Sequence, residues 1–171
     1  MRVRTMALGV LGTALAAGTL VHAADGNAVH RSGQPDVFMV PADDARMSEA
    51  VARARGSVEE FIAVFTKPGA RQRSFAIKVS VIGGAQIEEF WVDLESFANG
   101  QFTGHIANQP LNVDSVRLGD RIVVDKERIS DWMYVDRGRL IGGYTIRMLR
   151  AAMSADERRA FDATLPFDIT E

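Results

Sequence analysis

Phe75-Ala76-Ile77-Lys78-Val79-Ser80-Val81, near the middle of the 171-residue chain, shows the clearest structural pattern in the sequence. Apolar residues occupy every second position and the residues between them are small or polar, which predicts a strand with one buried face. The same period of two continues over 86–94, after a turn at Gly83-Gly84. Asn99-Gly100 is typical of a two-residue hairpin, because both residues tolerate positive φ. The centre of the chain is therefore predicted to consist of strands joined by short turns.

Helical spacing flanks these strands on both sides. Apolar residues recur every three or four positions over 47–66, which predicts one long helix, with Gly56 as a weak point within it. Beyond the strands, 145–153 has the same spacing, and Ser154-Ala155-Asp156-Glu157 is a capping box that begins another short helix. The predicted fold class is α+β, with a long N-terminal helix, a mainly antiparallel curved sheet or partial barrel of five to seven short strands, and two short C-terminal helices.

The first 23 residues have the three parts of a cleavable signal peptide. Arg2 and Arg4 give a positive start, 6–20 is an uncharged run of mostly small apolar residues, and Val21-His22-Ala23 supplies small residues around a cleavage point. The alternative is an uncleaved membrane anchor, but the run is shorter than the roughly 20 apolar residues that a spanning helix needs. The pattern predicts a periplasmic or secreted protein with no stable membrane span after cleavage.

Residues 24–35 are polar and predict a flexible leader, which leaves 36–171 as a single domain.

The sequence has no cysteine, which excludes disulfides, thiolate nucleophiles and cysteine-ligated metals. Without the two arginines of the predicted signal peptide, the formal net charge falls from −2 to about −4. This balance argues against general binding to nucleic acids or anionic membranes, because both require a basic excess.

The sequence offers little support for catalysis. Two of the three histidines lie in the predicted signal peptide and leader, so only His105 lies in a predicted strand. Glu88 and Glu89 are adjacent in a strand, so they point to opposite faces, and we expect both to be solvated. One usable histidine without cysteine does not make a zinc site, and no cofactor is predicted. An exported hydrolase that uses Asp131, His105 or Glu88 is the alternative.

Asp131-Trp132-Met133-Tyr134 is the first candidate for a binding site. Alternation places Trp132 and Tyr134 on one face of a strand and Asp131 and Met133 on the other. One interpretation is that the aromatic residues are core and that Asp131 accepts main-chain hydrogen bonds at a turn. The other is an aromatic ligand platform shared with Trp91.

Gly142-Gly143-Tyr144-Thr145 is the second candidate, because it leads from a predicted strand into a predicted helix. Glycines permit a close approach of a ligand, and a helix N-terminus attracts anions. Arg139 and Arg147 are near in sequence and would complete an anion site. The alternative is a tight packing turn with solvated arginines.

Residues 46–167 resemble the DUF2314 family, a bacterial domain of unknown function. The segments that carry the resemblance are Phe75-Ala76-Ile77-Lys78-Val79, Glu88-Glu89-Phe90-Trp91-Val92, Gly100-Gln101-Phe102-Thr103-Gly104, Leu118-Gly119-Asp120, Ile129-Ser130-Asp131-Trp132-Met133-Tyr134 and Gly138-Arg139-Leu140-Ile141-Gly142-Gly143-Tyr144-Thr145. The resemblance implies no particular reaction. Similar small domains occur as predicted immunity proteins of toxin systems, which suggests by analogy a protein that blocks a partner protein.

We interpret the chain as a non-catalytic binding module of the cell envelope, whose partner is an envelope protein or a small anionic ligand. A pocket that brings Asp131 and His105 within hydrogen-bond reach would favour the hydrolase instead. The candidate ligand-binding residues are Trp91, Asp131, Trp132, Tyr134, Gly142, Gly143, Tyr144, Arg139 and Arg147.

Overall fold

The computed structural model describes residues 44–84 and 86–170, together with the backbone of four short strands that precede them. These strands are β1 (Val3–Ala7), β2 (Leu20–Val21), β3 (Ala28–Arg31) and β4 (Gln34–Pro41). The predicted signal peptide and leader lie in large part outside the described residues, and their processing stays a prediction. In the described part of the chain, no helix is long and apolar enough to cross a membrane.

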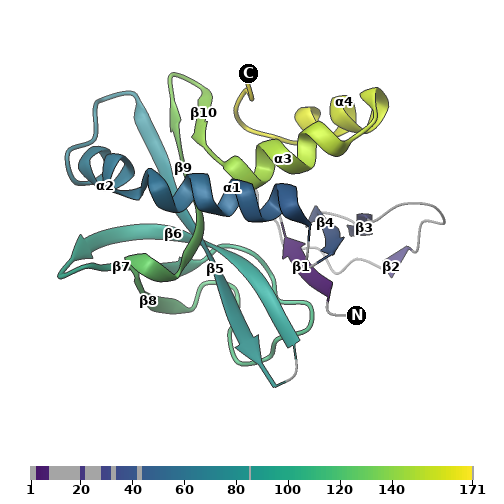
Figure 1. Ribbon diagram of the computed structural model, residues 1–171, viewed down its shortest axis with the longest axis horizontal. Coiled ribbons are helices and arrows are strands. Elements are labelled where there is room, and N and C mark those ends of the chain that lie inside the picture. Colours follow the sequence, from purple (N-terminus) through teal and green to yellow (C-terminus); the bar gives the residue numbers. More distant parts are fainter. Residues whose placement is uncertain are drawn as a thin grey trace.

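Six strands form an open antiparallel sheet in the order β10-β9-β5-β6-β7-β8 (Figure 1). Their bounds are β5 (Gln72–Gly83), β6 (Gln86–Ala98), β7 (Gln101–Ile106), β8 (Arg121–Asp125), β9 (Ile129–Asp136) and β10 (Arg139–Gly142). Beside the start of β6, β1 adds to this sheet in parallel and pairs with β4 on its other side.

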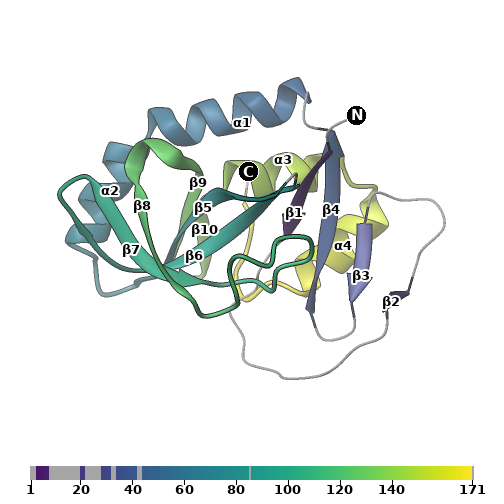
Figure 2. The same ribbon diagram turned by 90° about the horizontal axis from the view of Figure 1, so that it is seen from below.

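The predicted antiparallel sheet is confirmed, with two corrections. β5 and β6 are long strands of 12 and 13 residues, because their hairpin pairs along most of its length. The sheet is open rather than a partial barrel, since among the described strands β8 pairs only with β7 and β10 only with β9. Register shifts between Arg73 and Ala76 and between Leu94 and Ser96 bend the long strands, and Figure 2 shows the resulting curvature.

Two helices, α1 (Ala45–Gly56) and α2 (Val58–Thr66), replace the single long helix that the spacing predicts. The break is at Ser57, which has φ −113° and ψ 11°. Gly56 is a weak helix former, and the Ser57 hydroxyl donates to the Arg53 carbonyl at 2.8 Å, so the main chain leaves the helix here.

The two C-terminal helices, α3 (Tyr144–Ala152) and α4 (Ala155–Ala163), are as predicted, and the capping box of Ser154 and Glu157 is present. A 3-10 turn, Lys126–Arg128, joins β8 to β9.

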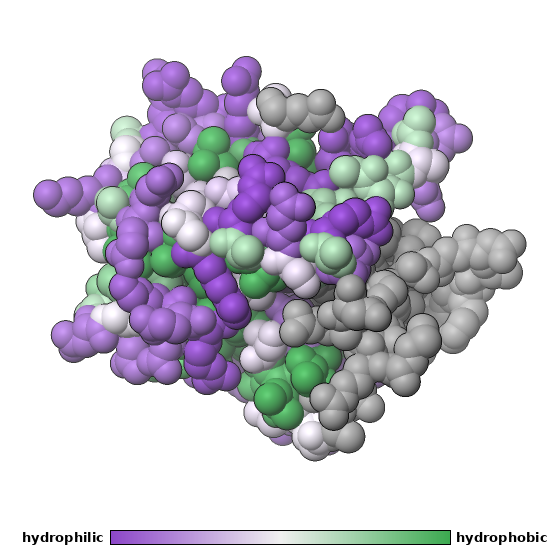
Figure 3. Space-filling model, in the orientation of Figure 1, coloured by the Kyte–Doolittle hydropathy of each residue, from purple (hydrophilic) through white to green (hydrophobic). Residues whose placement is uncertain are grey.

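Alternation along the strands divides the core into two clusters, one on each face of the sheet. Phe90 and Trp132 belong to the cluster with Phe61 of α2, whereas Trp91 and Met133 belong to the cluster with α3 and α4. Sequence neighbours separate in this way because strand side chains point alternately to opposite faces. α1 and α3 lie side by side across one side of the molecule, where the surface is mainly hydrophilic (Figures 1 and 3).

Candidate functional site

Charged side chains are buried together on the sheet face that carries α3. Lys78 of β5 lies between Trp91 of β6 and Asp131 of β9, and Glu89 is two residues before Trp91 on the same strand face. All four side chains belong to residues that are at most 1% exposed. The Lys78 ammonium donates to Thr145 Oγ1 at 3.0 Å and lies 5.2 Å from the centre of the Trp91 ring. Burial lowers the pKa of Lys78. The negative charges of Glu89 and Asp131 act in the opposite direction and raise that pKa.

The Asp131 carboxylate caps the first turn of α3. One oxygen accepts from the amides of Trp132 at 2.8 Å and Tyr144 at 3.1 Å, and the other from the amide and hydroxyl of Thr145 at 2.8 and 2.7 Å. Burial raises the pKa of Asp131, whereas Lys78 and these hydrogen bonds lower it. The helix amides that the sequence suggested for an external anion therefore bind a carboxylate of the protein itself.

Gly142 and Gly143 form a packing turn between β10 and α3. Their φ angles are 72° and 63°, in the left-handed region that favours glycine. The Gly143 amide donates to the Trp132 carbonyl at 2.8 Å, and a Cβ on Gly142 would lie 2.4 Å from that carbonyl oxygen. These glycines therefore let the turn approach the main chain of β9 closely. This agrees with the interpretation of Gly142 and Gly143 as a tight packing turn.

Arg139 and Arg147 do not form one site at this turn. Arg139 is exposed on β10. The Arg147 guanidinium is half-buried and donates to the carbonyls of Leu140 at 2.7 Å, Gly142 at 2.9 Å and Thr170 at 2.6 Å. Burial lowers the pKa of Arg147, but its partners are neutral carbonyls, so these bonds fix the side chain without neutralising its charge.

Trp132 and Tyr134 are core residues, and the ligand platform is not formed. They are 4% and 8% exposed, and the Trp132 ring stacks on Phe61 with centroids 5.0 Å apart. Trp132 Nε1 donates to the Ala54 carbonyl at 2.9 Å, so its polar atom is satisfied inside the protein. The two rings share a face, as alternation predicts, whereas Trp91 is buried on the opposite face.

Both adjacent glutamates are buried, which corrects the expectation that they are solvated. The Glu88 carboxylate accepts from the amides of residues 111–113 at 2.9–3.3 Å and so holds the loop between β7 and β8. The Glu89 carboxylate accepts from the hydroxyls of Ser80 and Ser130, the latter at 2.6 Å. Burial is tolerated because donors from distant segments satisfy each carboxylate.

His105 lies on β7 and, in the part of the chain that the structure describes, shares no hydrogen-bond partner with Asp131 or Glu88, so the structure does not join the three residues of the predicted hydrolase alternative in one hydrogen-bonded site. Its Nε2 is 2.9 Å from Glu95 Oε1, and its Nδ1 is 3.0 Å from the Gly119 carbonyl oxygen. The hydrogen bond to Gly119, followed by that to Glu95, raises the pKa of His105 above its ordinary value of 6.5. No group of three His, Asp or Glu side chains in the described residues is placed to hold a metal ion.

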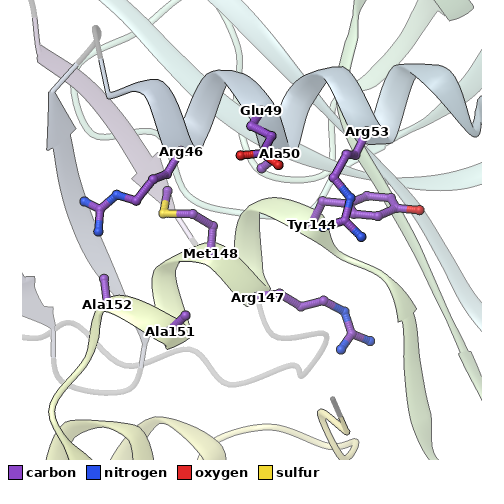
Figure 4. Close-up of a pocket in the computed structure, with 9 residues that line it drawn as sticks. All are labelled: Arg46, Glu49, Ala50, Arg53, Tyr144, Arg147, Met148, Ala151 and Ala152. Atoms are coloured by element: carbon purple, nitrogen blue, oxygen red, sulfur yellow. The ribbon is translucent and has the colours of Figure 1, made fainter.

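A groove of about 340 Å³ lies between α1 and α3 (Figure 4). Its lining combines arginines, one glutamate, one tyrosine and apolar side chains that are small or flexible: Arg46, Glu49, Ala50, Arg53, Tyr144, Arg147, Met148, Ala151 and Ala152. Of the candidate residues selected from the sequence, Tyr144 and Arg147 line this groove. Neither Asp131 nor His105 does.

Tyr144 and Arg53 form a fixed pair in the groove. The Tyr144 hydroxyl is 3.1 Å from Ser57 Oγ, and its ring meets Trp132 edge-on with centroids 5.6 Å apart. The Arg53 guanidinium carbon lies 5.2 Å from the centre of the Tyr144 ring, a cation–π contact. Because the tyrosine is held at its amide, ring and hydroxyl, it positions the arginine that stacks on it.

The groove carries uncompensated positive charge. Arg46 forms an ion pair with Asp44 at 2.8 Å. Within the described residues, by contrast, no carboxylate lies within 4 Å of the charged nitrogens of Arg53 or Arg147. Burial is the largest cause of the lowered pKa of Arg147; Tyr144 and Asp131 raise that pKa, and Arg150 and Arg53 lower it by repulsion. Among the described residues that line the groove, Glu49 is the single acidic one.

The α1 side of the groove was missed in the sequence. Arg46, Glu49 and Arg53 are spaced by three and four, which is also the spacing of any solvated helix face. The lining residues 144–152 repeat that spacing on α3. The two helix faces can therefore be recognised in the sequence by their residue spacing. The sequence does not show that these faces lie against each other.

The comparisons with known proteins agree with the resemblance noted in the sequence. The family model described as "Uncharacterized protein conserved in bacteria (DUF2314)" matches residues 44–169, which include both helices of the groove. The chain is similar to the uncharacterized protein YegJ of Escherichia coli, with 38% identity over 121 residues that cover 69% of this chain and 78% of that protein. It is also similar to a putative ankyrin repeat protein of Neisseria meningitidis serogroup B, with 34% identity over 85 residues that cover 50% of this chain and 34% of that protein.

No solved structure matches the chain. The family model covers well over half of the chain, and its bounds agree with the part that resembles the family in sequence. The chain belongs to the DUF2314 family.

Proposed function

We propose that this protein is an exported, non-catalytic binding module of the cell envelope, and that it binds a small anionic ligand in the groove between α1 and α3. The observation that carries the proposal is the pair Arg53 and Arg147, two guanidinium groups in one concave site that have no carboxylate partner among the described residues. Guanidinium groups bind carboxylates and phosphates through charge-assisted hydrogen bonds.

The rigidity of these side chains supports binding. Arg147 is held by three carbonyls, and Arg53 stacks on a tyrosine that is itself fixed. Little side-chain entropy is then lost when a ligand binds, which favours affinity. A volume of about 340 Å³ is at the lower end of the range for ligand sites, so the ligand is small.

The non-catalytic assignment rests on the composition of the groove. Among the described residues, its lining has no histidine, serine, threonine or lysine, so it offers no nucleophilic hydroxyl activated by histidine or lysine. The buried carboxylates of Asp131, Glu88 and Glu89 are engaged by amide and hydroxyl donors inside the protein. The envelope location rests on the signal-peptide pattern of residues 1–23, for which N-terminal sequencing of the exported protein is the direct test.

Binding is tested by titrating the protein with acetate and phosphate while backbone amide shifts are followed by NMR. We expect shifts in residues 49–53 and 144–151, weakened by salt because exposed charges are screened beyond about 10 Å at 0.1 M. Arg53→Ala should lower the affinity about tenfold or more, since hydrogen bonds to charged groups contribute about 1.5–3 kcal/mol.

Arg139→Ala is the matched control, because Arg139 is exposed and lies outside the groove. Unchanged binding in Arg139→Ala with a loss in Arg53→Ala places the site in the groove. A loss in Arg139→Ala and none in Arg53→Ala would contradict the proposal and favour the strand-to-helix turn at Gly142.

A further inference from the structure

We propose, on the basis of the binding function proposed above, that the groove selects amphiphilic anions. The ligand has a single negatively charged head, bound between Arg53 and Arg147, and an apolar body that lies along Met148, Ala151 and Ala152.

The two ends of the groove differ in chemistry. Figure 4 shows Arg53, Tyr144 and Arg147 towards one end and Met148, Ala151 and Ala152 towards the other. The alanines are exposed and Met148 is half-buried against the cluster that α3 and α4 form with the sheet. Small side chains leave space above Met148, so an apolar group can lie there and lose contact with water.

The length of the groove also indicates a ligand with a body. On α1 the lining runs from residue 46 to residue 53 and on α3 from 144 to 152. At 1.5 Å of rise per residue, these segments are about 10 and 12 Å long. A lone carboxylate or phosphate occupies only the arginine end. Among the described residues, the remaining length is lined by apolar side chains together with Glu49 and Arg46.

Glu49 limits the ligand to one charged end. It lies between the two ends of the groove, and no cation within 4 Å is paired with it in the described residues. Its charge repels a second anionic group placed along the groove. Arg46, at the apolar end, is occupied by Asp44, through a side-chain hydrogen bond that also lowers the pKa of Asp44. A monoanion with an apolar body therefore fits better than a dianion with two distant charges.

Two sources supply this chemistry: a short acyl acid, or a peptide that places an acidic side chain beside apolar ones. The affinities of acetate, butanoate, hexanoate and the dianion adipate are measured at constant ionic strength by NMR titration. A capped Leu-Leu-Glu tripeptide is the second arm, and the tighter of the two series identifies the source. We expect the affinity to rise about two- to fourfold for each added methylene group, the gain that follows from its removal from water. Adipate should bind more weakly than hexanoate.

Two variants test the assignment of the ends. Ala151→Gln keeps a good helix former but places a polar side chain at the apolar end, so the ratio of hexanoate to acetate affinity should fall towards one. Glu49→Gln should raise the affinity for adipate more than that for hexanoate. Acetate binding without any gain from acetate to hexanoate, or an unchanged ratio in Ala151→Gln, would overturn the inference and leave the proposed anion binding intact. If neither acetate nor phosphate shifts the groove residues, the proposed function itself is wrong.

Discussion

Replacing Asp131 with asparagine is the most direct test of how the sheet holds α3. The carboxylate accepts four hydrogen bonds from Trp132, Tyr144 and Thr145, and the residue is fully buried. Asparagine keeps the size of the side chain but exchanges one acceptor oxygen for an NH₂ group, which is itself a donor. Two of the four donors then lose their acceptor, and Lys78 loses one of the two carboxylates that oppose the effect of its burial.

The size of the effect follows from these losses. Each buried donor left without an acceptor costs about 1–3 kcal/mol, and breaking a buried charge pair costs about 3–5 kcal/mol. Because the two contributions overlap and Glu89 still faces Lys78, we expect the free energy of unfolding to fall by about 3–5 kcal/mol. With a urea m-value of about 1–3 kcal/mol/M, the midpoint should fall by about 1 M or more.

Urea unfolding followed by circular dichroism measures this change, with Asp136→Asn as the matched control. Asp136 is on the same strand but half-exposed, so its replacement should change stability by less than about 0.5 kcal/mol. Thr145→Val provides a milder variant if Asp131→Asn does not fold, and it should cost about 1–2 kcal/mol. A cost below about 1 kcal/mol for Asp131→Asn would refute the reasoning, because the cluster would then be hydrated rather than buried.

Three further changes test other parts of the fold. Trp132→Ala should cost about 3–5 kcal/mol in urea unfolding, because the 4% exposed ring fills the core; a midpoint that hardly moves would contradict this. Gly142→Ala should destabilise by more than about 1 kcal/mol, since its Cβ meets the Trp132 carbonyl and its φ is positive. NMR titration should give His105 a pKa above 6.5 that falls in Glu95→Gln. Because that pKa is raised on folding, its contribution to stability is present below pH 6.5 and is lost as the pH rises through the folded value.

Local patterns predicted much of the fold correctly. Alternation placed Trp132 and Tyr134 on one face of β9 and Asp131 on the other, because the side-chain period of a strand depends on its own backbone alone. The capping box at Ser154 and Glu157 was also predicted correctly, because its two partners are only three residues apart in the chain. The alternative in which Asp131 accepts main-chain hydrogen bonds at a turn was also correct. Only the structure shows that most of these donors belong to α3.

Interactions between distant segments were beyond the sequence. Glu88 and Glu89 were expected to be solvated because glutamate usually is, yet a loop 23–25 residues away and two strands bring donors to them. One of the two interpretations left the helix amides near Gly143 free for a ligand, but the Asp131 carboxylate of β9 accepts hydrogen bonds from the amides of Tyr144 and Thr145. Burial of a charge depends on which partners the fold brings, and composition does not contain that information.

The sequence by itself determined the α+β class, the antiparallel strands followed by two C-terminal helices, and the face of the sheet on which each strand residue lies. These properties follow from spacing along one segment of chain. The groove between α1 and α3 was decided only by the tertiary structure, because Arg53 and Arg147 are 94 positions apart in the chain and line one groove only through helix packing. An exposed arginine on a helix has the same local pattern whether it faces solvent or another helix, and only the packing of the second helix turns that surface into a site.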